Sequence, residues 1–199
     1  MSIPPSSIDS VCVYCGSSDA ADPAWLRAAS RLGAGLAEEG LRLVYGGGGV
    51  GLMGACARAA HAAGGRVLGI MPQFLVSREI VLDDVETVIV TSMHERKIRM
   101  FDAADGFVVL PGAIGTLEEA VELLSWRRLG LHAKPIVFFN PDEFWRPLFA
   151  LFDLFIDSRL VPPEFTSCWR VVDDIEQAIP ALRAMPAGQA VAPVMRVVA

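Results

Sequence analysis

The sequence has few basic residues and few metal-binding side chains. Its formal net charge is −6, with 17 lysines and arginines against 23 aspartates and glutamates. Such a chain has no basic surface for a nucleic-acid backbone, although a single small phosphate needs only local donors. The three histidines lie far apart, with no ligand spacing around them. We therefore expect no nucleic-acid partner and no bound metal.

Long apolar runs are also missing. No stretch approaches the roughly 18 apolar residues that indicate a transmembrane helix. The start of the chain, Met1–Pro5, has neither the basic residues nor the apolar core of a secretory signal. We expect a cytoplasmic protein without a membrane partner.

A redox role for the cysteines is not favoured. Cys12 and Cys15 match C-x-x-C, but that motif acts when it caps a helix, and here it lies in an expected strand. At this spacing the two thiols point to opposite faces of a strand. We interpret both residues as structural.

Short apolar runs alternate with helical patterns along the 199 residues, of which 53% are hydrophobic. This alternation predicts an α/β fold, a doubly wound, Rossmann-like parallel sheet with helices on both faces and a ligand beyond the carboxyl ends of the strands. We expect one nucleotide-binding domain over residues 1–185 and a flexible tail over 186–199. Strands are expected at Val11–Tyr14, Leu41–Tyr45, Val67–Met71, Thr87–Val90, Gly106–Leu110, Ile136–Phe139 and Arg170–Val172. Helices are expected at about Pro23–Glu39, Val50–Ala63, Met93–Ala103, Phe144–Ser158 and Asp174–Met185, with a further one ending near Leu129.

The glycine run over residues 46–51 contains a formal G-x-G-x-x-G. A dinucleotide site would follow the first strand and have an acidic residue about 20 positions later for the ribose. This run follows the second expected strand, and residues 66–78 contain no Asp or Glu. NAD binding is therefore not expected, and no Gly-Lys-Ser/Thr marks a P-loop. We interpret the run as a tight turn whose bare backbone, including Gly47 and Gly48, lets a nucleotide approach closely.

Two cations and two thioethers share one face of the helix expected to begin near residue 93. Met93, Arg96, Lys97 and Met100 lie at positions i, i+3, i+4 and i+7. One interpretation is a half-buried helix on which Arg96 extends its charged end to solvent. The other is a nucleotide cleft, where the methionines pack against the base and the two cations meet oxygens or a carboxylate.

The most informative segment is 110–119, where an apolar strand runs into a glycine-rich turn that opens a helix. Free backbone N–H groups at a helix start bind phosphate. Glu119, one turn further on, would reach whatever that phosphate is attached to, which predicts chemistry on a sugar phosphate or nucleotide. Thr116 and Glu119 also match T-x-x-E, a capping box that alone could account for both residues. The preceding Pro-Gly and the Arg-Lys stripe favour the functional interpretation.

These motifs resemble those of the LONELY GUY family, cytokinin riboside 5'-monophosphate phosphoribohydrolases whose homologues are often labelled lysine decarboxylases. The matching segments are 13–18, 45–54, and 93–100 together with 111–119. The resemblance runs from about Val11 to Trp126. It departs at Ala113, where the family has a glycine. If residue 113 needed a positive φ, alanine there would cost about 1–2 kcal/mol.

The resemblance implies hydrolysis of the N-glycosidic bond of adenosine 5'-monophosphates, plain or N6-substituted, to free base and ribose 5-phosphate. It implies Arg96 and Glu119 as the catalytic pair, no cofactor, and a homodimer with the cleft near the subunit interface. Glu119 would stabilise positive charge on the ribose or activate water, with Arg96 keeping it ionised and oriented. The residues expected to bind the nucleotide are Ser17, Gly47, Gly48, Glu79, Met93, Lys97, Gly112, Ala113, Ile114, Gly115, Thr116, Glu118 and Ser125.

Two other functions stay open. A pyridoxal phosphate-dependent lysine decarboxylase needs a Schiff-base lysine, and the only lysines are Lys97 and Lys134. Lys134 precedes Pro135 at a strand start, a poor place for a cofactor anchor. A non-catalytic nucleotide carrier or sensor on the same scaffold is the non-enzyme alternative, since fold does not fix function.

Overall fold

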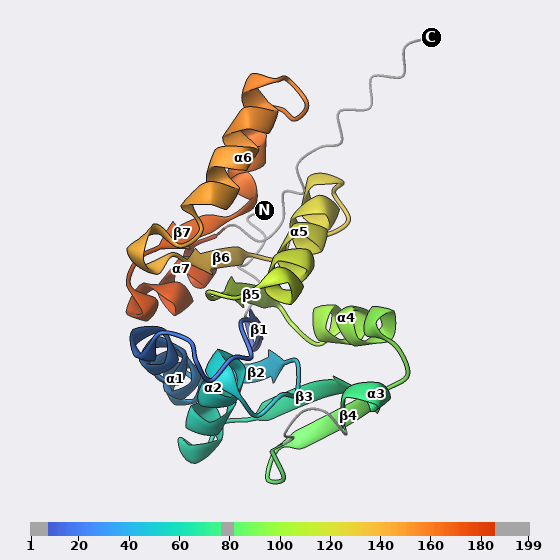
Figure 1. The fold of residues 1–199 in the computed structure, drawn as a ribbon, viewed down its shortest axis with the longest axis vertical. Coiled ribbons are helices and arrows are strands. Elements are labelled where there is room, and N and C mark those ends of the chain that lie inside the picture. The colour runs from blue at the N-terminus through green and yellow to red at the C-terminus, as the bar shows by residue number, and fades with distance from the viewer. Residues whose placement is uncertain (1–7, 77–81, 186–199) are drawn as a thin grey trace, which may run out of the picture.

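The computed structural model describes residues 8–76 and 82–185. Within them a parallel sheet has the strand order β4-β3-β2-β1-β5-β6-β7 (Figure 1). The strands are β1 (Ser10–Tyr14), β2 (Arg42–Tyr45), β3 (Val67–Pro72), β4 (Glu86–Val90), β5 (Gly106–Val109), β6 (Ile136–Phe139) and β7 (Arg170–Val172). Each lies within two residues of its expected bounds, and parallel pairing along the whole sheet confirms the predicted fold class.

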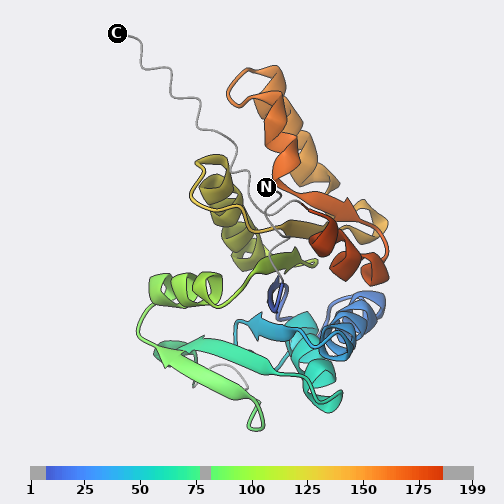
Figure 2. The same cartoon turned by 180° about the vertical axis from the view of Figure 1, so that it is seen from behind.

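Helices cover both faces of the sheet, as Figure 1 and the reverse view in Figure 2 show. The α-helices are α1 (Pro23–Glu38), α2 (Gly51–Ala62), α3 (Gln73–Val76), α4 (Met93–Asp102), α5 (Ile114–Arg128), α6 (Arg146–Asp157) and α7 (Ala178–Ala184). Short 3₁₀ turns are η1 (Pro141–Glu143), η2 (Pro163–Cys168) and η3 (Ile175–Gln177). Helices α1, α2 and α7 build one apolar cluster with the sheet, and α4, α5 and α6 build the other.

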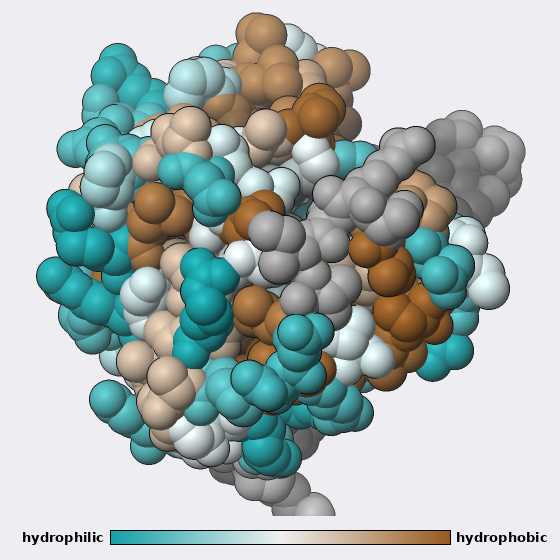
Figure 3. All heavy atoms as spheres, turned by 60° about the horizontal axis from the view of Figure 1, so that its bottom comes forward, coloured by the Kyte–Doolittle hydropathy of each residue, from teal (hydrophilic) through white to brown (hydrophobic). Residues whose placement is uncertain are grey.

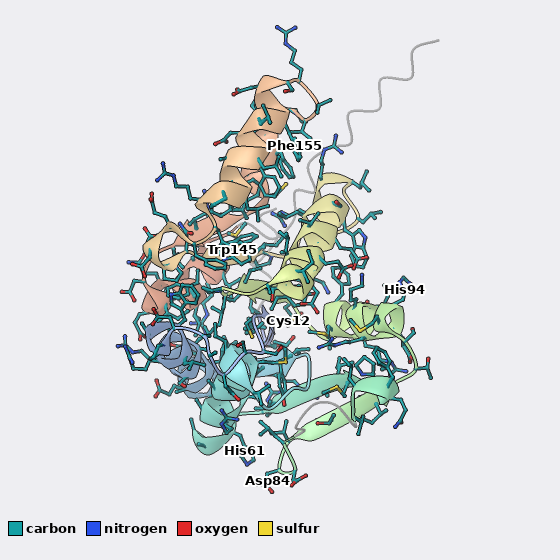
Figure 4. All side chains as sticks on the ribbon, viewed as in Figure 1. Cys12, His61, Asp84, His94, Trp145 and Phe155 are labelled. Carbon is teal, nitrogen blue, oxygen red and sulfur yellow. The ribbon has the colours of Figure 1, made fainter. Side chains whose placement is uncertain are left out.

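Successive side chains of the central strand β1 point to opposite faces of the sheet and therefore contribute to both apolar clusters. Val11 and Val13 belong to the α1/α2 side, whereas Cys12 and Tyr14 belong to the α4/α5 side. Cys12 lies near the middle of the sheet (Figure 4). Cys15 is buried on the face opposite to Cys12, as predicted. The two thiols therefore belong to separate parts of the core.

The expected helix over Asp174–Met185 is wrong in its first turn. The chain instead forms η3, capped by the Asp174 side chain, which accepts a hydrogen bond from the Glu176 N–H at 3.1 Å. Pro180 has no N–H to donate to Glu176, so a continuous α-helix cannot begin at residue 175. The α-helix starts at Ala178, where Pro180 falls in the first turn.

Strand order determines where a ligand-binding crevice can form. From β1 the chain winds outward through β2 and β3 to β4, then returns to β5 on the other side of β1 and continues to β7. The direction reverses between β1 and β5, and ligands of such sheets bind beyond the strand carboxyl ends at that point. No helix within the described residues is long and apolar enough to cross a membrane. The predicted tail, 186–199, lies outside those residues.

Candidate active site

A cavity of about 220 Å³ lies at the carboxyl ends of β1 and β5, where the strand order reverses. Its walls come from the segment after β1, from α2 and α4, and from the start of α5. The lining residues are Cys15, Gly16, Ser17, Met53, Met93, Arg96, Ala113, Gly115, Thr116, Glu118 and Glu119. The structure thus brings both expected catalytic residues into one cavity.

Several residues expected to contact the nucleotide are not among those that line this cavity. Gly47 and Gly48 are buried, and the Gly48 N–H points to the Met53 sulfur at 3.2 Å. Ile114 is largely exposed, and Ser125 is exposed further along α5. Glu79 lies outside the described residues. Their roles remain predictions.

Three residues that line the cavity, Cys15, Gly16 and Met53, were not expected to bind the nucleotide. The Gly16 N–H donates to the Pro111 carbonyl at 3.0 Å, and the Gly16 carbonyl accepts from the Met53 N–H at 3.2 Å. These bonds join the ends of β1 and β5 to α2. The position of Cys15 and Gly16 directly after the first strand could have indicated them, but nothing local marks Met53.

Arg96 is held by backbone carbonyl groups. Its Nε donates to the Ile70 carbonyl at 3.2 Å and its Nη2 to the Gly46 carbonyl at 2.9 Å, while Nη1 lies 3.8 Å from the Met93 sulfur. Only 6% of the residue is exposed, so the alternative of a solvent-directed arginine is wrong.

Gly46, the first glycine of the 46–51 run, leaves space for the side chain of Arg96. A Cβ atom at Gly46 would lie 2.0 Å from Nη2 of Arg96. At Gly46 the bare backbone therefore makes room for the guanidinium group of Arg96, whereas the glycine run was predicted to make room for a nucleotide. The close approach of Arg96 explains why residue 46 has no side chain.

Helix α5 begins without a side-chain cap. Its N-cap residue is Ala113, with φ −95° and no side-chain hydrogen bond. The first intrahelical bond runs from the Leu117 N–H to the Ala113 carbonyl at 3.0 Å, so the N–H groups of residues 114–116 have no helical carbonyl partner. Alanine adopts this φ freely, so the backbone penalty considered for residue 113 does not arise.

The capping-box alternative for Thr116 and Glu119 is wrong. Thr116 lies inside the helix and is only 4% exposed. It packs under Gly112, where an added Cβ would be 2.2 Å from the threonine Oγ1 and 2.9 Å from the Gly16 nitrogen. Gly112 therefore permits the close turn that places α5 against the segment after β1.

Burial raises the pKa of Glu119 from 4.5 to about 7; Arg96 and Lys97 oppose this shift, and Glu118 and Glu122 add to it. No ion pair within 4 Å joins Glu119 to Arg96 in the described part of the chain. The Arg96 charge favours the ionised form of Glu119, but the loss of solvation outweighs this effect on the pKa. Burial thus favours the neutral form of Glu119 more than it is favoured in a solvent-exposed glutamate. The role of Arg96 in keeping Glu119 ionised remains a prediction.

The raised pKa of Glu119 predicts that stability changes with pH in the direction opposite to that expected for a carboxylate with a lowered pKa. The folded chain binds the Glu119 proton more tightly than the unfolded chain, so the free energy of unfolding falls as pH rises from 4.5 to about 7. The total loss is as much as about 3 kcal/mol. We expect Glu119→Gln to be more stable than wild type at pH 8 and equally stable at pH 4, as measured by urea unfolding. Equal stability at pH 8 would contradict the raised pKa.

Neither lysine has a free amine. Lys97 Nζ pairs with Glu118 and with Glu122, the latter at 3.1 Å. Lys134 Nζ donates to the Phe101 carbonyl at 2.6 Å and lies 4.0 Å from the centre of the Phe101 ring. Neither lysine lines the cavity at the carboxyl ends of β1 and β5, and both amines already have partners, so they fit a Schiff-base role there poorly.

Comparison with known proteins identifies the family of the chain. Residues 53–182 match the family model described as "Possible lysine decarboxylase". The chain is 43% identical over 154 residues to the cytokinin riboside 5'-monophosphate phosphoribohydrolase LOG7 of Arabidopsis thaliana, covering 77% of this chain and 71% of that protein. It is 42% identical over 152 residues to LOG of Oryza sativa subsp. japonica, covering 76% of this chain and 63% of that protein.

Solved structures share the fold at lower identity. The molybdenum cofactor binding protein from Rippkaea orientalis is 25% identical with a TM-score of 0.66, covering 88% of this chain and 95% of that one. The Moco carrier protein from Chlamydomonas reinhardtii is 20% identical with a TM-score of 0.69, covering 90% and 98%. These likenesses concern the fold. The family match and the identity to the plant proteins establish that the chain belongs to the LOG family, whose family model carries the lysine decarboxylase description.

Proposed function

We propose that this chain hydrolyses the N-glycosidic bond of adenosine 5'-monophosphates, plain or N6-substituted, and releases the free base and ribose 5-phosphate. The observation that carries the proposal is the combination of an uncapped helix start and a carboxyl group with a pKa of about 7 in one cavity. The names of the plant relatives support the same reaction class.

The start of α5 would hold the 5'-phosphate. The N–H groups of residues 114–116 lack helical partners, and the positive end of the helix dipole favours an anion there. Gly115 leaves open space beside them, since an added Cβ would meet no atom within 4 Å. With the phosphate fixed, the sugar is positioned beside Glu119, one turn along the helix.

Glu119 and Arg96 would then act on the ribose. The bond from the anomeric carbon to the base nitrogen breaks, a water oxygen bonds to that carbon, and the base leaves with a proton. Positive charge develops on the ribose, and an ionised carboxylate stabilises it or takes the proton of the attacking water. Arg96 supplies a fixed positive charge beside this carboxylate.

A homodimer in the cytoplasm is part of the proposal. Helix α5 and the loop after it expose large apolar side chains, Ile114, Val121, Leu129 and Leu131. Figure 3 shows one face of the molecule, on which apolar side chains are interspersed with hydrophilic ones. Cover of Ile114 by a second copy would place the partner next to Ala113 and Gly115, which line the cavity. Sedimentation at the monomer mass alone would contradict the dimer.

A substrate panel tests the function. We expect AMP and isopentenyladenosine monophosphate to release base and ribose 5-phosphate, and adenosine to react at least about 100-fold more slowly because it lacks the phosphate anchor. Chromatography of the base and an enzymatic assay of ribose 5-phosphate give independent readouts.

Other outcomes of this panel would favour the alternatives. Tight AMP binding without base release indicates a carrier, for which Glu119 would have no use. Lysine-dependent release of carbon dioxide in the presence of pyridoxal phosphate indicates a decarboxylase. Either result would overturn the proposed hydrolysis.

A further inference from the structure

Arg96 and Glu119, the expected catalytic pair, lie on two helices that pack against different elements of the fold. Helix α4, which carries Arg96, packs on β3 and β4, whereas α5, which carries Glu119, packs on β1 and η2. Arg96 and Glu119 do not form an ion pair. Their relative position therefore depends on whatever joins the two helices.

Helices α4 and α5 contact each other both beside the cavity and further away from it. Lys97, next to Arg96, reaches across to Glu118 and Glu122 on α5, and only 13% of its side chain is exposed. One helical turn further along, the rings of Phe101 and Trp126 meet edge to face at 5.1 Å. Lys97 is thus the charged link nearest to the reacting groups, since Glu118 also lines the cavity.

We propose that Lys97 is a positioning residue, whose ion pairs with Glu118 and Glu122 hold α5 against α4 and keep the Glu119 carboxyl group facing the cavity beside Arg96. The family resemblance assigns Lys97 a nucleotide contact, which is a different role. The catalytic part of this inference rests on the proposed function, whereas the structural part does not.

Lys97 also balances charge around Glu119. Arg96 and Lys97 face Glu119 from α4, and Glu118 and Glu122 lie beside it on α5. The charge of the same carboxylate adds to the raised pKa values of Cys12 and Tyr14 on β1 and of Cys15 directly after it. Without Lys97 two neighbouring carboxylates lose their cation, so the pKa of Glu119 should rise above its value of about 7.

The direct test is a titration of Glu119 by ¹³C NMR of its side-chain carboxyl carbon, assigned with Glu119→Gln. We expect Lys97→Met to shift the midpoint upward and Lys97→Arg to restore much of the wild-type value. The matched control is Arg99→Met, which removes an ion pair to Glu95 within α4 and should leave the midpoint unchanged. An unchanged midpoint in Lys97→Met would overturn the inference.

Kinetics separate positioning from substrate contact. We expect Lys97→Met to lower kcat for AMP about tenfold, with KM changed less than about threefold. A large rise in KM with an unmoved Glu119 titration would assign Lys97 to the substrate and overturn the positioning role. If wild type releases no base at all, the proposed function fails, but the titration still decides whether Lys97 acts on Glu119.

Discussion

Glu119→Gln is expected to lower kcat for base release from AMP about 10³-fold, because a neutral amide cannot stabilise positive charge on the ribose or accept a proton from water. Affinity for AMP should change little, since the backbone N–H groups at the start of α5 remain in place. Base release under single-turnover conditions measures the chemical step, and calorimetry measures AMP binding.

The control for this substitution makes the same chemical change elsewhere. Glu176→Gln alters an exposed carboxylate that pairs with Arg31 at 3.7 Å, and its activity should equal that of wild type. Undiminished turnover in Glu119→Gln would remove Glu119 from the mechanism.

The pH profile gives a second readout of Glu119. If the ionised form is active, kcat/KM of wild type falls below a midpoint near 7, about tenfold per pH unit. A midpoint near 6 would belong to the second ionisation of the phosphate group, which has a pKa of about 6.

Gly46→Ala is expected to reduce activity about 100-fold while the fold persists. The new methyl group would lie 2.0 Å from Nη2 of Arg96, so the guanidinium group must leave the carbonyls of Gly46 and Ile70. A misplaced charge stabilises the transition state poorly. Turnover of AMP and circular dichroism of the variant together check the prediction.

A double-mutant cycle assigns this effect to Arg96. If Gly46→Ala acts through the arginine, adding it to Arg96→Met should cause no further loss. Gly35→Ala is the matched control, because its Cβ would meet the Ile179 side chain at an ordinary 3.6 Å. An additive double mutant would show that Gly46 acts on something other than Arg96.

The strands and the place of the site could be predicted from local sequence. Buried parallel strands such as Ile136–Phe139 are continuous apolar runs, and their periodicity differs from that of amphipathic helices. The reversal of strand order then places Ser17 and Thr116 at one edge. These features require only chain order and hydrophobic pattern.

What escaped prediction depends on contacts distant in sequence. The role of Gly46 requires Arg96, which lies 50 residues away. Residues 116–119 match the capping-box pattern, but the helix already begins at Ile114. The Thr116 side chain packs against Gly112 instead of capping the helix. The pKa of Glu119 reflects burial between two helices and a strand, which no local pattern encodes.

The hydrogen-bond partners of the Arg96 side chain are backbone carbonyl groups, which do not neutralise its charge. Because Gly46 and Ile70 offer neutral dipoles rather than a carboxylate, the guanidinium keeps its whole charge in the cavity. Its electrostatic field is preorganised by the ends of two strands and needs no reorganisation when a transition state forms. The cavity therefore contains a positive charge whose position is fixed before any substrate binds.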